Sequence, residues 1–400
     1  MVRLPPVYSP ISLGAITGAI AAAMVGASVE VRALRQLLLE RFSADDVLLT
    51  ASGTSALQVA LGLLPENPRG ERAVAMPAYS CYDLVTAANG ADFRIRFYDV
   101  DPGTLSVDLP SLRAAVAEGV SGVVAANLYG YPLDWPGIRS ITDEAGIPVI
   151  EDAAQGLGTA ASAGGGGSLG DLTVLSFGRG KGWTGGGGGA LLRRGPRAPE
   201  FPDPIDEHSG HLARGVRATR STLVTTAAWA LGRPTLYGVP AAIPGLGLGE
   251  TVYKEPTRPR QLMGFNAALV RRTESSSLDA IAGRREVASA LIQALSGADE
   301  INVLTPLGGH ERASFLRLPV LASSQSVADR LRRDGPRYGV QSGYPKPLHR
   351  LRAAQKLTQP DEDSLGGGTA LSERLFTLPT HQWIGTSEVE ALARLLRPTV

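Results

Sequence analysis

The segment "DVLLTASGTSALQVALGLL", residues 46–64, sets a short apolar strand directly before a helix-forming run. Residues 46–50 are β-rich, and a turn of small residues separates them from the helical pattern at 54–64. A helical segment, "PGIRSITDEAG" (136–146), lies between two of the later strand-like runs. These runs are "RAVAMP" (72–77), "RIRFYDV" (94–100), "GVVAAN" (122–127) and "IPVIED" (147–152). Such alternation predicts an α/β fold with a mostly parallel sheet, in which ligands bind at the carboxyl ends of the strands.

The composition limits the class of protein. The chain has 400 residues, which is enough for two domains or for one large domain with a smaller companion. Charged residues make up 19% and the formal net charge is +1, so no strong field attracts nucleic acid. The single cysteine, Cys81, cannot form an internal disulfide, which favours a reducing compartment such as the cytoplasm. His208 and His211 have Pro, Asp, Ser and Gly neighbours, which favour a solvated loop over a metal site.

Two apolar stretches have to be weighed as membrane segments. The first, "ISLGAITGAIAAAMVGA" (11–27), is uncharged, but it is shorter than a spanning helix needs and is mostly Ala and Gly. It also follows only one basic residue, Arg3, unlike a signal peptide. We therefore expect a buried helix there. The second stretch, 223–248, contains Arg233 and several prolines, so we expect no membrane span in it.

Small residues follow the strand at 46–50. A Gly-Thr-Ser turn that opens a helix presents backbone N–H groups, hydroxyls and the positive end of the helix dipole, which together make an anion site. Ser52, Gly53 and Thr54 are therefore candidates to hold a phosphate. For this motif alone, a helix N-cap without any ligand is the simpler interpretation.

Two carboxylates stand at the end of the run "IPVIED". An acid at the carboxyl end of a strand can point into the site, where a cationic ring nitrogen would keep it ionised. Strand pleating sends Glu151 and Asp152 to opposite faces of the sheet, so we expect only one of them to do this. A helix-capping acid is the alternative.

The stretch "SFGRGKGWTGGGGGALL" (176–192) places Lys181 among glycines, which let a ligand come close to the backbone. A phosphate loop would need a glycine five residues before Gly180, where Leu175 stands. It would also need Ser or Thr after the lysine, where Gly182 stands. The spacing therefore favours the other interpretation, a lysine that forms an imine with a cofactor.

The stretch "GGGSLG" (165–170) matches a dinucleotide-binding fingerprint, but no convincing strand precedes it and no helix clearly follows, so we interpret it as a loop. The three strand ends form a different combination. They offer a phosphate-binding turn at 52–54, an acid at 151–152 for a ring nitrogen and, about thirty residues later, a lysine able to form a Schiff base. Pyridoxal 5′-phosphate requires this set of groups from a protein.

Longer stretches carry a resemblance to one family. They are "SGTSAL" (52–57), "VAMPAYSCYDLVTAANGADFRIRFYDVDPGTLSVD" (74–108), "NLYGYPLDWPGI" (127–138), "IPVIEDAAQGLG" (147–158), "GSLGDLTVLSFGRGKGWTGGGGGAL" (167–191) and "LPTHQWIGTSEVEALARLL" (378–396). In order and spacing the chain resembles the sugar aminotransferases of the DegT/StrS kind, a branch of the fold-type I pyridoxal-phosphate enzymes. The resemblance implies a large cofactor-binding domain at 1–258 and a smaller C-terminal α+β domain at 259–400. Within the latter we expect a helix around 262–296 and a last helix at 386–396.

The resemblance assigns roles residue by residue. Lys181 matches the lysine of the family's Ser-Phe-x-x-x-Lys pattern, which carries the cofactor, and Asp152 matches the acid that keeps the pyridine nitrogen protonated. These two would be the catalytic residues. Gln155 would contact the phenolic side of the ring, and Ser176 with the turn at 52–54 would hold the phosphate. The resemblance also implies a homodimer whose sites are completed by the partner chain.

Two features depart from the family's pattern near the cofactor and its entrance. Where relatives often stack an aromatic residue on the ring, this chain has Cys81, with Tyr79 and Tyr82 beside it. Cys81 would therefore face the cofactor, unless a neighbour does. Residues 195–258 are longer and more apolar than the family's pattern, so we expect this insertion to reshape the substrate entrance or the dimer contact.

A third departure lies in the stretch that reaches the partner's phosphate in relatives. In place of Asn-x-Arg-Met this chain reads "EPTRPRQLM" (255–263), in which Arg258 or Arg260 would substitute electrostatically.

The resemblance implies transfer of an amino group from an amino acid, L-glutamate first, to a keto sugar carried on a nucleotide. The product would be an amino sugar for a polysaccharide, a glycolipid or a secondary metabolite. Two alternatives stay open: another fold-type I enzyme, such as a lyase or dehydratase, and a regulatory member without turnover. Lys181 argues against the family's sugar dehydratases, in which histidine replaces the lysine.

Overall fold

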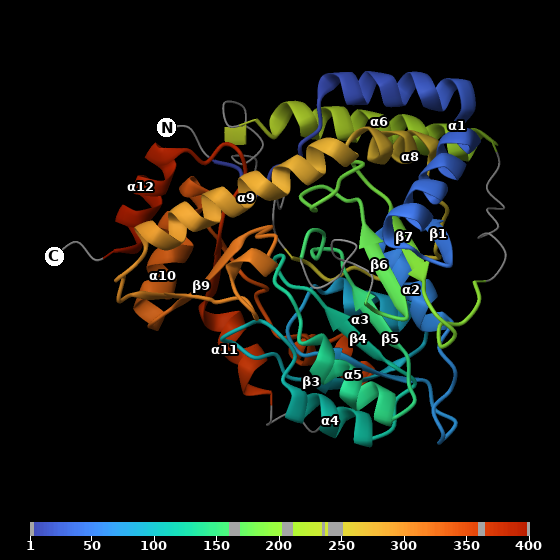
Figure 1. The fold of residues 1–400 in the computed structure, drawn as a ribbon, viewed down its shortest axis with the longest axis horizontal. Coiled ribbons are helices and arrows are strands. Elements are labelled where there is room, and N and C mark those ends of the chain that lie inside the picture. The colour runs from blue at the N-terminus through green and yellow to red at the C-terminus, as the bar shows by residue number, and fades with distance from the viewer. Residues whose placement is uncertain are drawn as a thin grey trace.

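The computed structural model describes residues 4–159, 169–201, 211–233, 237–238, 251–358 and 365–397. These residues form two sheets with helices around them (Figure 1). The expectations for His208 and for residues 165–168 of the "GGGSLG" stretch lie outside the described residues.

The first sheet has seven strands in the order β1-β7-β6-β5-β4-β2-β3. They are β1 (Asp46–Thr50), β2 (Ala73–Pro77), β3 (Arg94–Tyr98), β4 (Val123–Ala126), β5 (Val149–Asp152), β6 (Leu172–Ser176) and β7 (Gly189–Arg193). Neighbours from β6 to β3 pair in parallel, whereas β7 pairs antiparallel with both β6 and β1. Only β7 therefore runs against the other strands, which confirms the predicted mostly parallel sheet.

Helices cover both faces of this sheet because pleating divides the side chains of each strand between the faces. Along β2, Met76 belongs to an apolar cluster with Leu57 of α2 and Val85 of α3. Its neighbour Ala75 belongs to a second cluster with Leu112 of α4. The helices between the strands are α2 (Gly53–Gly62), α3 (Asp83–Gly90), α4 (Leu109–Ala117) and α5 (Trp135–Glu144).

Four further helices lie above the first sheet in Figure 1 or lead away from it. They are α1 (Leu13–Phe42), α6 (His211–Leu231), α8 (Gly264–Arg272) and α9 (Glu274–Ala294). The expected helix at 262–296 is thus two helices. They meet at Thr273, whose hydroxyl donates to the Thr184 carbonyl at 2.6 Å. α1 bends at Gly26, and α8 packs along it so closely that a Cβ on Gly264 would lie 2.5 Å from the Ala27 Cβ.

The apolar stretch at 11–27 forms the first half of α1, but the prediction that it is buried was wrong. In the most apolar 18-residue window of α1, only 17% is buried. Met24 is 83% exposed and Val25 is 92% exposed. Among the described residues, α1 is the single helix long and apolar enough to cross a membrane. The physical reason for its exposure is that α8 covers one side of α1 and leaves the other uncovered.

A second sheet lies toward the C-terminus, with four antiparallel strands in the order β10-β11-β9-β8. They are β8 (Ile301–Val303), β9 (Leu318–Ala322), β10 (Gln341–Ser342) and β11 (Leu375–Leu378). Its helices are α10 (Gln325–Asp334), α11 (Gly366–Arg374) and α12 (Thr386–Leu396), with 3₁₀ turns at His310–Arg312, Gly335–Tyr338, Leu348–Arg350 and Ala354–Lys356. The predicted α+β C-terminal part is confirmed. The boundary at residue 258 stays a prediction.

Candidate active site

A cavity of about 850 Å³ opens at the carboxyl ends of the parallel strands. This is the edge at which an α/β sheet is expected to bind its ligand. The eight residues that the sequence singled out come from four segments of the chain, at the ends of β1, β2, β5 and β6, and all of them line this cavity. They are Ser52, Gly53, Thr54, Cys81, Asp152, Gln155, Ser176 and Lys181.

The turn after β1 forms one end of the cavity. Ser52 caps α2: its hydroxyl oxygen accepts from the Ser55 amide at 3.1 Å and donates to the Ser55 hydroxyl at 3.0 Å. The next residue, Gly53, lies against Ser176 of β6, where an added Cβ would be 2.9 Å from the Ser176 Cβ. The first amides of a helix have no partner within that helix, so this end suits an anion between Thr54 and Ser176.

The two acids at the end of β5 point to opposite sides, as pleating requires. Glu151 is buried, and its carboxylate accepts from the Leu169 amide at 3.0 Å and the Gly170 amide at 3.4 Å. Asp152 lines the cavity, and its Oδ1 accepts from the Ala154 amide at 3.1 Å. Glu151 therefore fixes a loop on the far side, and Asp152 is the acid available to a ligand.

Opposing effects act on the Asp152 carboxyl. Burial raises its pKa, because the charged form is poorly solvated in the cavity wall. The positive charge of Lys181 lowers the same pKa, which places the ammonium close to the carboxylate. A second cation near Asp152 would favour its ionised form further.

Lys181 lies in the loop that follows β6, and the N-terminal segment holds this loop in place. The Gly180 amide donates to the Ser9 hydroxyl at 3.0 Å. Gly180 has φ +72, and a Cβ on it would lie 2.7 Å from the Val7 side chain. Glycine is needed here for both reasons, since other residues rarely adopt this φ and the contact leaves no room. The loop thus presents Lys181 to the cavity from a fixed backbone.

Gln155 is held from two sides. Its Oε1 accepts from the Tyr129 amide at 2.8 Å, and its Nε2 donates to the Tyr344 hydroxyl at 2.7 Å. Tyr344 follows β10 of the second sheet, and its amide donates to the Tyr79 hydroxyl at 2.8 Å. Tyr344 could not be predicted from the sequence, because nothing in its local sequence connects it to a residue 189 positions away.

Cys81 lines the cavity, whereas its neighbours Tyr79 and Tyr82 do not. Burial raises the pKa of the Cys81 thiol to about 12, so the thiol is neutral at physiological pH. A neutral thiol behaves as a small apolar group, which suits contact with a ring. Its role toward a cofactor stays a prediction.

The insertion at 195–258 contributes to the cavity through α6 and the residues after it. Trp229 and Arg233 line the cavity, and so does Lys254. Arg258 and Arg260, one of which we expected to reach the partner's phosphate, do not line the cavity of their own chain. Among the described residues, no group of three His, Cys, Asp or Glu side chains is placed to hold a metal ion.

The model of the DegT/DnrJ/EryC1/StrS aminotransferase family matches residues 17–214 and 254–397. The chain belongs to this family. A curated relative from Acidithiobacillus ferrooxidans, UDP-N-acetyl-3-dehydro-alpha-D-glucosamine 3-aminotransferase, is 34% identical over 32% of this chain and 34% of its own length. A Bacillus subtilis relative, 3-oxo-glucose-6-phosphate:glutamate aminotransferase, is 34% identical over 33% of this chain and 28% of its own.

Solved structures resemble this chain over almost its whole length. The structure of DesI in the presence of its TDP-sugar product has a TM-score of 0.72 at 21% identity, and the match covers 99% of this chain and 92% of that chain. At this identity the likeness shows the fold. The matches to the two curated relatives, in contrast, span about a third of each relative's length.

This family membership and the fold-type I architecture indicate pyridoxal 5′-phosphate as the cofactor. The donor set in the cavity fits such a group. At one side of the cavity, the turn at Gly53 can bind an anion, and a Cβ on Gly53 would not fit there. The carboxylate of Asp152 and the amine of Lys181 lie elsewhere in the same cavity. Asp152 would hold the ring nitrogen, and Ser176 with the turn at 52–54 would hold the phosphate.

Proposed function

We propose that this chain is a pyridoxal-phosphate-dependent aminotransferase that carries an amino group from L-glutamate to a keto sugar linked to a nucleotide. The observation that carries the proposal is that Asp152, Lys181 and the turn at 52–54 line one cavity. Two relatives, one named for a UDP-linked sugar and one named for glutamate, support the choice of acceptor and donor. The product is an amino sugar, and a cytoplasmic location belongs to the same proposal.

When bound, the cofactor supplies an electron-withdrawing ring that stabilises a carbanion at the donor's α-carbon. Asp152 keeps a proton on the ring nitrogen, because a buried carboxylate opposite a cation favours the charged pair. Asp152 is anchored for this task by the Ala154 amide.

The ε-amine of Lys181 takes the proton from the α-carbon of the amino donor as a general base. A base must stay close to the proton it removes, and the bond from Gly180 to Ser9 holds the backbone beside Lys181 in place. The helix dipole of α2 and the hydroxyls of Ser52 and Ser176 bind the phosphate and fix the orientation of the reacting groups.

The first half of the reaction tests this proposal because it needs no sugar. Protein loaded with pyridoxal phosphate and given L-glutamate alone should release 2-oxoglutarate in an amount equal to the enzyme. A panel of nucleotide-linked keto sugars then identifies the acceptor. If cofactor binds and none of the common amino donors yields its keto acid, the chain is a lyase or a regulatory member instead.

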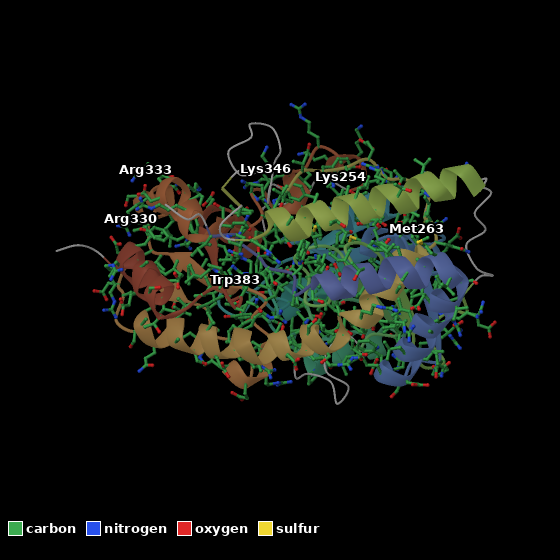
Figure 2. All side chains as sticks on the ribbon, turned by 90° about the horizontal axis from the view of Figure 1, so that it is seen from above. Lys254, Met263, Arg330, Arg333, Lys346 and Trp383 are labelled. Carbon is green, nitrogen blue, oxygen red and sulfur yellow. The ribbon has the colours of Figure 1, made fainter. Side chains whose placement is uncertain are left out.

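We also infer that the chain forms a homodimer through the exposed apolar face of α1 and α6, which lie side by side in Figures 1 and 2. The exposed apolar side chains are Leu13, Met24, Val25 and Val29 on α1 and Val216, Leu223, Val224 and Leu231 on α6. A face of this kind usually marks an interaction surface. The other side of α6 lines the cavity, so a partner here lies beside the cavity mouth, as sites shared between subunits require.

Light scattering on the purified protein tests the dimer. Val25→Asp combined with Leu223→Asp should convert the dimer into a monomer, because each change buries a charge in the contact. Arg394→Ala on α12 is the control and should leave the dimer intact. A wild-type monomer that binds phospholipid vesicles through the same residues would contradict the dimer and assign the face to lipid.

A further inference from the structure

The family match leaves out residues 215–253, yet part of this segment forms a wall of the cavity. Thr225, Ala228, Trp229 and Gly232 all line the cavity. Their spacing of three and four residues puts them on one side of α6. The wall is therefore a property of this chain beyond the family's shared pattern. Its residues can contribute to the choice of substrate.

Arg233 is fixed on this wall by an aromatic ring. Its guanidinium carbon lies 4.3 Å from the centroid of the Trp229 ring, a close cation–π contact. Stacking occupies a flat side of the guanidinium and leaves the N–H groups around its edge available to a ligand. Arg233 is exposed and lines the cavity, so a bound ligand can reach these donors.

The N-terminal segment lines the same cavity as Arg233. The Tyr8 ring packs edge-on against Trp383, with 5.6 Å between centroids, and lines the cavity as well. Burial raises the pKa of the Tyr8 hydroxyl, and the charge of Arg233 partly opposes this rise, which places the guanidinium near the phenol. Arg233 thus stacks on an aromatic ring and has a neutral hydroxyl in its neighbourhood.

Further cations line the same cavity. Arg179 lies near Lys181 in the glycine loop, and Lys254 lies just after the segment 215–253 that the family match leaves out. Together with Arg233 they outnumber the two acids Asp83 and Glu255, which also line the cavity. The positive excess favours an anionic ligand.

We propose that Arg233, stacked on Trp229 and assisted by Arg179 and Lys254, binds a phosphate group of the amino acceptor. The acceptor is then a phosphorylated or nucleotide-linked keto sugar, and a free keto sugar is a poor substrate. Guanidinium groups pair with phosphate through two parallel hydrogen bonds, which orient the ligand as well as attract it. This inference rests on the proposed aminotransferase function, because it names a part of that enzyme's substrate.

Calorimetric binding to the cofactor-loaded protein tests the proposal, because the bound cofactor already fills the phosphate end at residues 52–54. The probes are UDP, inorganic pyrophosphate and glucose 6-phosphate, which separate a nucleotide diphosphate from a sugar monophosphate. Arg233→Ala should weaken the best probe at least tenfold, and Arg233→Lys should lose less because it keeps the charge. Trp229→Leu should weaken binding by an intermediate factor. Arg220→Ala, an exposed arginine of α6 outside the cavity, should bind like the wild type.

Three results would overturn the proposal. The first is that Arg233→Ala binds every probe as tightly as the Arg220→Ala control, and the second is that the wild type binds none of the probes. The third is that Arg233→Ala raises only the glutamate concentration needed for 2-oxoglutarate release, which assigns Arg233 to the donor's carboxylate. Binding that depends on Arg233 in a protein that releases no 2-oxoglutarate would contradict the proposed function and leave the phosphate site standing.

Discussion

The side-chain nitrogen of Gln155 donates to the hydroxyl of Tyr344 at 2.7 Å, and this bond joins the end of the first sheet to the segment after β10. The Gln155 side chain has its other end fixed by the Tyr129 amide, so the position of Tyr344 decides where Gln155 can lie. Tyr344 thus acts on the cavity through Gln155. A cofactor bound beside Gln155 therefore depends on how the two sheets sit together.

Tyr344→Phe should weaken cofactor binding several-fold and lower the free energy of unfolding by about 1 kcal/mol, because it leaves the Gln155 amide without its partner. Cofactor dissociation followed by absorbance, together with denaturant unfolding, measures both effects. Tyr338→Phe, whose ring stacks under Arg337 and does not line the cavity, is the matched control. Equal cofactor affinity in the two variants would remove Gln155 from cofactor positioning.

Asp152→Asn should keep the bound cofactor and lose at least a hundredfold in turnover, because the amide cannot keep the ring nitrogen protonated. The neighbouring Glu151→Gln is the matched control, since Glu151 points away from the cavity and binds the 169–170 backbone. It should lower stability by about 1–3 kcal/mol while turnover stays near the wild-type value. Full activity of Asp152→Asn would exclude Asp152 from the mechanism.

Lys181→Ala should abolish release of 2-oxoglutarate from L-glutamate, since it removes both the covalent partner of the cofactor and the proton carrier. The fold should survive, because Lys181 lies in a loop whose backbone is held by the contact between Gly180 and Ser9. Circular dichroism and gel filtration check the fold independently of activity. Turnover that persists in this variant would mean that another base serves the reaction.

Gly53→Ala should weaken cofactor binding tenfold or more, because its Cβ would lie 2.9 Å from the Ser176 Cβ and force apart the two elements that hold the phosphate. Gly62→Ala in the same helix, where no atom lies within 4 Å of the added Cβ, is the control. It should leave cofactor binding unchanged and raise stability by roughly 0.5–1 kcal/mol. Equal cofactor affinity in both variants would contradict the assigned phosphate end.

Acid should destabilise the protein through His381. Burial lowers the pKa of this histidine to about 4, and its Nε2 donates to the Pro5 carbonyl in the neutral form. Because the unfolded chain takes up this proton at about pH 6.5, stability is full above that pH and falls toward pH 4, by about 3 kcal/mol in all. His381→Gln should be less stable at pH 7 but show a flatter decline in calorimetric scans. Parallel pH profiles would assign the decline to other groups.

The sequence predicted the parts of the fold that local patterns determine. The helix at 386–396 and the strands around β5 and β6 follow from periodicity and from the turn residues beside them. The eight candidate site residues line one cavity because they follow strands that end at the same edge. Their roles toward a cofactor are predictions that the variants above can test.

Other features depend on contacts between segments far apart in the chain. Tyr344 reaches Gln155 only after the second sheet has packed, and periodicity carries no signal for that contact. The exposure of Met24 depends on what packs beside α1, which its composition does not determine. At the break between α8 and α9, the Thr273 hydroxyl bonds to the distant Thr184 carbonyl, a contact that helical periodicity does not predict.

The reversed strand β7 sets the spacing between the strands that carry the two ends of the cofactor site. It lies between β1, which ends at the turn with Ser52, and β6, which leads to Lys181. With neighbouring strands about 4.8 Å apart, β5 with Asp152 lies about 14 Å from β1, whereas the end of β6 at Ser176 is in contact with the turn after β1 at Gly53. A ligand must be long to touch both ends at once, so free phosphate and dephosphorylated pyridoxal should each bind one end and miss the other.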